Sequence, residues 1–178
     1  MRMLMIMMMM AGTCLADELE EMGDFIEVEV LPFMGFTAVG VVYTGDSAEE
    51  VMDTWLEFLQ RVGEIPGLYA EEDAYGILLE FDPESGEFSY MAAVAAEDPD
   101  PVPEGMLRID LQPGTYAVFT FPFHMLEDVY DFAYGEWLPV SGFIKGDGYD
   151  FEYYPEDFMP SEEGVLMQLY VSIQEEDL

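Results

Sequence analysis

The 178-residue chain is 51% hydrophobic, yet its 39 acidic residues face only four lysines and arginines, which gives a formal net charge of −35. Nucleic acids and anionic membranes are excluded as partners, because phosphate recognition needs clusters of Lys and Arg that four such residues cannot form. A chain of this size and hydrophobic content buries about two thirds of its surface, so we expect one globular domain and not a disordered polyanion.

The acidic residues are scattered along the whole chain, and this distribution leaves three interpretations open. A solvated acidic shell is typical of proteins in salt-rich surroundings, where counterions screen self-repulsion. The same charge would also concentrate cationic ligands near the protein. A third interpretation is mimicry of DNA toward a basic protein partner, although the acidic residues show no regular spacing.

Residues 1–16 have the layout of a secretory signal peptide. Arg2 precedes an apolar run that is too short to span a bilayer, and small residues lead to Ala16, where we expect cleavage. The mature protein would then be periplasmic or extracellular and would lack Cys14, the only cysteine. In the alternative interpretation, translation starts at Met22 and the protein is cytoplasmic.

The first half of the chain, about residues 25–97, reads as strand, helix, strand, strand. A first strand is expected over residues 36–43, and Ser47 with Glu50 forms a capping-box pattern at the start of a helix that Gly63 ends. The apolar face of this helix comprises Val51, Trp55, Phe58, Leu59 and Val62. Two further strands are expected over residues 75–81 and 87–95.

The second half, about residues 104–175, repeats this order after a linker rich in proline and aspartate at residues 97–104. A strand over residues 115–121 precedes a helix that Pro139 is expected to stop. The apolar face of this helix comprises Leu126, Val129, Tyr130, Ala133 and Trp137. Strands over residues 149–154 and 165–173 complete the half.

The repeated order predicts an α+β fold. Two β-α-β-β repeats would form one antiparallel sheet, with both helices packed on one face. Residues 17–178 would then be a single domain with a cleft between its pseudo-symmetric halves. Loops and strand edges of both halves converge at such a junction, so we expect a ligand there.

Several sequence runs resemble the GyrI-like, AraC effector-binding family. The runs are PEGM (103–106), PGTYAVF (113–119), EWLPVSGF (136–143) and DFEYY (150–154), with YGI (75–77) and FSYMA (88–92) in the first half. Together the similarity covers about residues 25–173. Two departures are a closing strand, residues 166–173, without the usual Tyr-Ile-Pro ending, and the expected signal segment.

The resemblance implies a duplicated antiparallel domain that binds lipophilic, often cationic, compounds. Members of the family act as the sensor half of a regulator or as separate proteins, and some related proteins hydrolyse strained genotoxic compounds. No helix-turn-helix pattern is visible in this sequence, so we expect a stand-alone binding protein.

The resemblance also implies a site residue, because Glu152 matches the family's buried, ligand-facing glutamate. On a strand, Glu152 and Tyr154 share a face, while Phe151 and Tyr153 lie on the other. A buried carboxylate either takes up a proton or pairs with a cation. Aromatic residues expected to surround that cation are Tyr75, Tyr90, Tyr116, Trp137 and Tyr154. A solvated surface position for Glu152 and a purely structural role for the rings remain the alternatives.

The leading hypothesis is therefore binding of a lipophilic, cationic small molecule. A hydrolase is the alternative, with Glu152 activating water and Tyr116 polarising the leaving group. An acidic interaction or inhibitor protein with a basic partner is the second alternative. Because His124 is the only histidine, we expect no catalytic triad, metal or cofactor, and we expect residues 147–150 to form a solvated turn.

Overall fold

The computed structural model describes residues 25–68, 73–82, 84–156, 158–159 and 164–176. The predicted signal peptide, with its cleavage site and Cys14, lies outside these residues. Within the described part of the chain, no helix is both long enough and apolar enough to cross a membrane.

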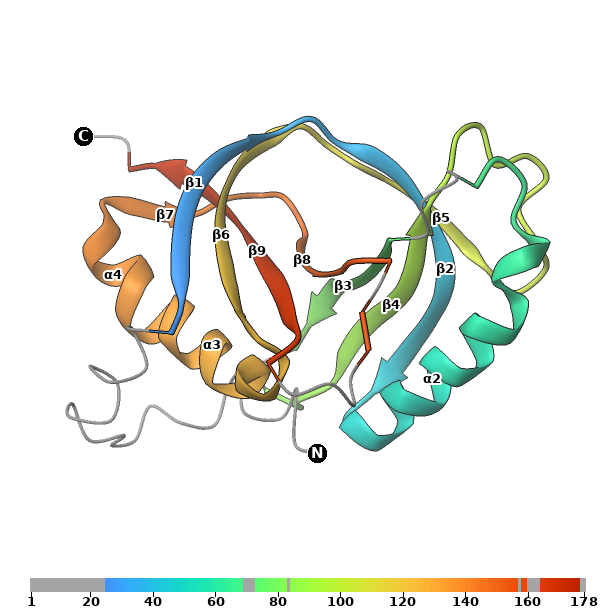
Figure 1. Ribbon diagram of the computed structural model, residues 1–178, viewed down its shortest axis with the longest axis horizontal. Coiled ribbons are helices and arrows are strands. Elements are labelled where there is room, and N and C mark those ends of the chain that lie inside the picture. Colours follow the sequence, from blue (N-terminus) through green and yellow to red (C-terminus); the bar gives the residue numbers. More distant parts are fainter. Residues whose placement is uncertain (1–24, 69–72, 83, 157, 160–163, 177–178) are drawn as a thin grey trace.

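In the described residues, nine antiparallel strands form one curved sheet, which together with the helices confirms the predicted α+β fold (Figure 1). The neighbours in the sheet follow the order β1-β6-β9-β8-β3-β4-β2-β5, and β7 also pairs with β9. The strands are β1 (Glu27–Phe33), β2 (Phe36–Gly45), β3 (Ala74–Phe81), β4 (Phe88–Ala95), β5 (Leu107–Leu111), β6 (Gly114–Pro122), β7 (Phe143–Lys145), β8 (Asp150–Tyr154) and β9 (Leu166–Glu175).

The strand order is symmetric about the pairing of β3 with β8, in which Gly76 lies opposite Glu152. Strands β3, β4 and β2 follow one another on one side, and β8, β9 and β6 follow in the corresponding order on the other. The outermost strands are exchanged, because β1 pairs with β6 and β5 pairs with β2. Strands β1, β5 and β7 were not predicted, since edge strands bury few residues and show little of the alternation that identifies a strand.

Helix α2 (Ala48–Arg61) begins after Ser47, as predicted, but the predicted capping box is wrong. The Ser47 side chain makes no capping hydrogen bond, and its backbone N–H donates to the hydroxyl of Tyr43 at 2.8 Å instead. Leu59, which was expected on the buried face, is 57% exposed. A 3-10 turn, η2 (Val62–Glu64), follows the helix.

The predicted stop of the second helix at Pro139 is also wrong. After the 3-10 turn η3 (Phe123–Met125), the helical segment runs through α3 (Leu126–Phe132), the π-helical η4 (Ala133–Trp137) and α4 (Leu138–Ser141). The widened π turn ends at Trp137, two residues before the proline, and such turns relieve local mismatches in helical hydrogen bonding. The segment ends at Gly142, whose φ of 81° is the left-handed conformation typical of a helix C-terminus.

Both helices lie on the same face of the sheet, toward its opposite ends (Figure 1). Phe58 of α2 packs against β2 and β4, whereas α3 packs against alternate residues of β6 such as Phe119. The intervening residues of β6, including Tyr116, face the opposite side and join Phe151 in a separate core. The central strands β3 and β8 therefore present their helix-side residues between the two helices.

Candidate functional site

The central feature of the helix-bearing face is the carboxylate of Glu152, which is 0% exposed. Three tyrosine hydroxyls donate hydrogen bonds to it. Tyr90 of β4 and Tyr154 of β8 reach Oε2 at 2.7 and 2.6 Å, and Tyr130 of α3 reaches Oε1 at 3.0 Å. Three phenols therefore supply the hydrogen bonds of the buried carboxylate, in addition to the proton or cation expected from the sequence. We call these four residues the Glu152 cluster.

Helix α2 also reaches the cluster, through Trp55. The indole N–H donates to the hydroxyl oxygen of Tyr90 at 3.2 Å. Because an indole can only donate, the O–H of Tyr90 is left to donate to the carboxylate. The Trp55 ring also meets the Tyr154 ring edge to face, with centroids 5.4 Å apart. Side chains from both helices thus converge on one carboxylate.

Gly76 of β3 provides the space for this arrangement. A Cβ atom at this position would lie 2.6 Å from Glu152 Oε2 and closer still to the hydroxyl of Tyr90. Both contacts are too short for any side chain, so a glycine opposite Glu152 is what allows the phenol and the carboxylate to meet over β3.

Burial raises the pKa of Glu152, and the hydrogen bonds from Tyr154, Tyr90 and Tyr130 counteract that rise. Burial and the charge of Glu152 raise the pKa values of the three phenols well above their ordinary value, so all three keep their protons. No basic residue of the described part of the chain forms an ion pair with Glu152. Those cations pair elsewhere: Arg61 with Glu57 and Glu64, Arg108 with Asp110 and Lys145 with Asp150.

The raised pKa of Glu152 predicts a pH-dependent stability. In the unfolded chain Glu152 has the ordinary glutamate pKa of about 4.3, and in the folded protein its pKa is higher. At pH values between these two, the folded protein binds more protons than the unfolded chain. The stabilisation that the proton supplies is thus lost as pH rises through that interval. We expect the free energy of unfolding of the wild type, relative to Glu152→Gln, to fall with rising pH in urea titrations. A difference that grows with pH would show that the phenols lower the pKa instead.

The structure divides the six predicted site residues among three places. Glu152, Tyr90 and Tyr154 lie together, which rules out a solvated position for Glu152. Tyr75 and Tyr116 lie on the opposite face, where both rings pack around Phe151. Trp137 packs against Phe119 and Phe143. The expectation that all six line one cleft is therefore wrong, because the pairing of the strands places Tyr75 opposite Tyr153, on the face that Glu152 does not share, and Tyr116 packs on that same face.

Two members of the site were missed from sequence. Tyr130 and Trp55 were both placed on apolar helix faces and interpreted as packing residues. A signal was nevertheless present, since a buried tyrosine or tryptophan needs a hydrogen-bond partner for its polar atom. The partner could not be identified, because the sequence does not reveal which strand residue each helix covers.

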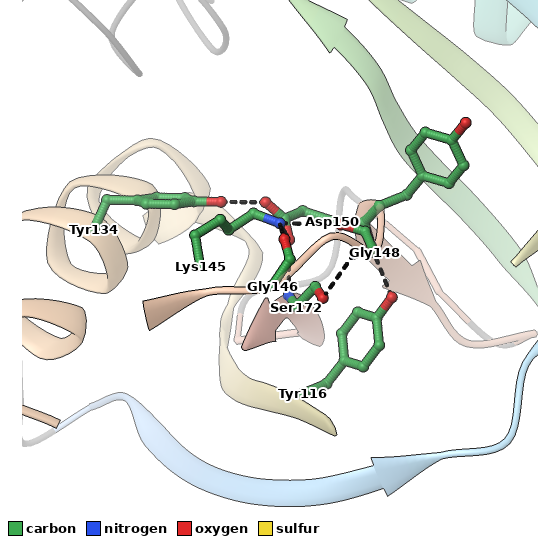
Figure 2. A network of polar contacts seen from close by, with 8 residues as sticks. Tyr116, Tyr134, Lys145, Gly146, Gly148, Asp150 and Ser172 are labelled. Carbon is green, nitrogen blue, oxygen red and sulfur yellow. Dashed lines mark hydrogen bonds and ion pairs between the residues drawn. The ribbon is translucent and has the colours of Figure 1, made fainter. Parts of the chain in front are cut away.

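The predicted solvated turn at residues 147–150 is wrong at its last position. Asp147 and Tyr149 are exposed, but Asp150 is only 4% exposed and opens β8 on the same face as Glu152. Its carboxylate accepts hydrogen bonds from Tyr134 and from the backbone N–H of Ser172 (Figure 2). Among the described residues, no group of three or more His, Cys, Asp or Glu side chains is arranged to hold a metal ion.

The sequence matches one family profile over residues 33–173, described as Cass2, the integron-associated effector binding protein. A curated relative, the transcriptional regulator BrlR of Pseudomonas aeruginosa, is 32% identical over 142 residues, which are 78% of this chain and 52% of the regulator. The chain thus spans about half the length of that relative.

Solved structures share the fold at low sequence identity. The EcmrR C-terminal domain superimposes with a TM-score of 0.70 at 8% identity, over 84% of this chain and 98% of that domain. SAV2435 bound to tetraphenylphosphonium gives a TM-score of 0.61 at 15% identity, over 83% of this chain and 94% of that one.

Proposed function

Because the chain belongs to the Cass2 family of integron-associated effector-binding proteins, we propose that it binds a lipophilic organic cation at the Glu152 cluster. This membership confirms the GyrI-like resemblance of the motifs. The observation that carries the proposal is a fully buried carboxylate with three phenol donors and no ion-paired cation among the described residues. A cationic effector would supply the missing countercharge.

The surroundings of the carboxylate fit such a ligand. The phenols stabilise the negative charge by hydrogen bonds, while the rings of Tyr90 and Tyr154, and of Trp55 beside the cluster, supply aromatic groups. A cation over an aromatic face gains about 0.5–2 kcal/mol per ring, in addition to the burial of apolar ligand surface. SAV2435, which shares the fold, has been solved with the lipophilic cation tetraphenylphosphonium, and this supports the same ligand class here.

Ligand entry requires a rearrangement, because Glu152 is fully covered. Tyr130 is the cluster residue that comes from a helix, so a ligand that displaces its hydroxyl would reach the carboxylate. Effector binding would then be coupled to the position of a helix, which is a physical route for signalling to a partner or to a further domain.

The experiment is a calorimetric titration with tetraphenylphosphonium and with neutral triphenylmethanol. We expect Glu152→Gln to weaken binding of the cation about 10- to 100-fold, as for loss of a charged partner, and to change binding of the neutral compound little. Glu87→Gln, at an exposed position, changes the net charge equally and serves as the control. An equal loss for both compounds would refute a charge-based role of Glu152.

The hydrolase alternative loses its proposed pair of residues. Tyr116 lies across the sheet from Glu152 and donates its hydroxyl to the backbone carbonyl of Tyr149 at 3.1 Å. The two groups face opposite sides of β6 and β8, so they cannot act on one bound molecule.

A further inference from the structure

A second buried carboxylate lies two residues before Glu152 on the same face of β8. Asp150 accepts hydrogen bonds from the hydroxyl of Tyr134 and, at 2.7 Å, from the backbone N–H of Ser172. Residues two apart on a strand are separated by about 6.6 Å along the chain, so the charges of Asp150 and Glu152 act on the same neighbourhood. A cation bound at Glu152 would therefore respond to the charge state around Asp150.

Asp150 differs from Glu152 in having its own cation. Lys145 Nζ lies 3.1 Å from Asp150 Oδ1, and it also donates to the carbonyl oxygens of Gly146 at 2.9 Å and Gly148 at 3.0 Å (Figure 2). Three oxygen acceptors satisfy all three N–H groups of the ammonium. The carboxylate and the ammonium thus form a neutral pair.

The loop that follows Lys145 is hydrogen-bonded to β9 and packs closely against it. The backbone N–H of Gly146 donates to the carbonyl oxygen of Ser172 at 2.8 Å, and that of Gly148 donates to its Oγ at 3.1 Å. A Cβ atom on Gly146 would lie 2.6 Å from Ser172 Oγ, and one on Gly148 would lie 2.8 Å from the same atom. The ammonium therefore sits in a constrained loop, although its side chain is 39% exposed.

We propose that Lys145 makes the site selective for ligands with a single positive charge. Lys145 neutralises Asp150, so that Glu152 is the one carboxylate of β8 without a cation of its own. The inference rests on the proposed function, since it concerns cations at the Glu152 cluster. A dication would face the attraction of one carboxylate and the repulsion of a nearby ammonium for its second charge. Lys145 acts through Asp150 and not by touching the ligand.

The test compares benzyltrimethylammonium with its bis-quaternary counterpart, p-xylylene-bis(trimethylammonium), by calorimetry in about 150 mM salt, where long-range attraction by the acidic surface is screened. The quantity measured is the ratio of the dication's affinity to the monocation's. Burial raises the pKa of Asp150, and Lys145 counteracts this rise, so the titrations are made at about pH 8.5 to favour the ionised carboxylate.

We expect Lys145→Met to raise the ratio about tenfold, because two uncompensated carboxylates then face the ligand. Asp150→Asn should lower the ratio, because an unpaired ammonium remains. The double variant carries neither charge and should return the ratio to within about threefold of the wild type, which damage to the loop alone would not do. Arg108→Met removes a cation from β5, which is four strands away from β8 or about 19 Å along the sheet, and should leave the ratio unchanged.

The inference would be overturned if Lys145→Met and Asp150→Asn shifted the ratio in the same direction, or if neither shifted it. If Lys145→Met does not fold, Asp150→Asn and the double variant still test it, since their ratios are expected to differ. Failure of the proposed function would give a different result from failure of this inference. The wild type would then bind neither cation, or Glu152→Gln would bind both cations with unchanged affinity.

Discussion

Replacing Glu152 by leucine is expected to lower the free energy of unfolding by about 3–6 kcal/mol, measured by urea denaturation. Leucine removes a buried carboxylate and adds buried apolar surface, and each of these changes by itself would favour folding. It also leaves the hydroxyls of Tyr90, Tyr130 and Tyr154 without their acceptor, at about 1–3 kcal/mol for each buried unsatisfied donor. The orphaned donors outweigh the gain, so the carboxylate is also an organising element of the fold.

Glu152→Gln is the matched control for this prediction. Glutamine keeps an acceptor oxygen in the same place and should cost less, about 1–2 kcal/mol. Tyr130→Phe removes a single donor and leaves two others on the carboxylate, so its cost should also be about 1–2 kcal/mol. A leucine variant as stable as the wild type would show that the phenols find other partners and that Glu152 is dispensable for folding.

Gly76→Ala is expected to cost about 3 kcal/mol and to weaken binding of tetraphenylphosphonium more than tenfold. The φ of Gly76 is not positive, so its backbone tolerates alanine and the penalty comes from space alone. The new methyl group would overlap the hydroxyl of Tyr90 and lie 2.6 Å from Glu152 Oε2. The side chain of Tyr90 is fully buried in close-packed surroundings and cannot move away from the new methyl group, so the hydrogen bonds of the cluster must break.

Gly135→Ala provides the control for this substitution. Gly135 is exposed in the π-helical segment, and a Cβ atom there meets nothing within 4 Å. Alanine should therefore be neutral or stabilising by up to about 1 kcal/mol, in line with its helix propensity. Equal losses for both variants would mean that glycine flexibility, and not the space above β3, decides the outcome at Gly76.

The strands that build the core could be predicted from sequence because their residues alternate. In β6 the odd-numbered Ala117 and Phe119 face the helices, and the even-numbered Tyr116 faces away, as a period of two requires. The same rule placed Glu152 and Tyr154 together. The fold class follows from two such patterns, each interrupted by a helical one.

The composition of the site could be predicted only in part. Alternation shows which residues of one strand share a face, but it does not show which residues of different strands lie on the same face of the sheet. Tyr75 and Tyr116 were grouped with Glu152 by aromatic character, although their registers place them across the sheet. Tyr130 and Trp55 entered the site through the positions of the helices over the sheet, which depend on packing of the whole fold. The burial of Asp150 likewise depends on Lys145, Tyr134 and Ser172 meeting in space.

The reciprocal placement of β1 and β5 has a consequence for how this protein can be divided. A fragment ending after β4 would carry β1 without the β6 to which it is hydrogen-bonded, and it would expose the outer edge of β2 that β5 covers. Such an open edge recruits strands from other molecules. Expression of either half alone should therefore yield insoluble material, whereas co-expression of both fragments should reconstitute the domain.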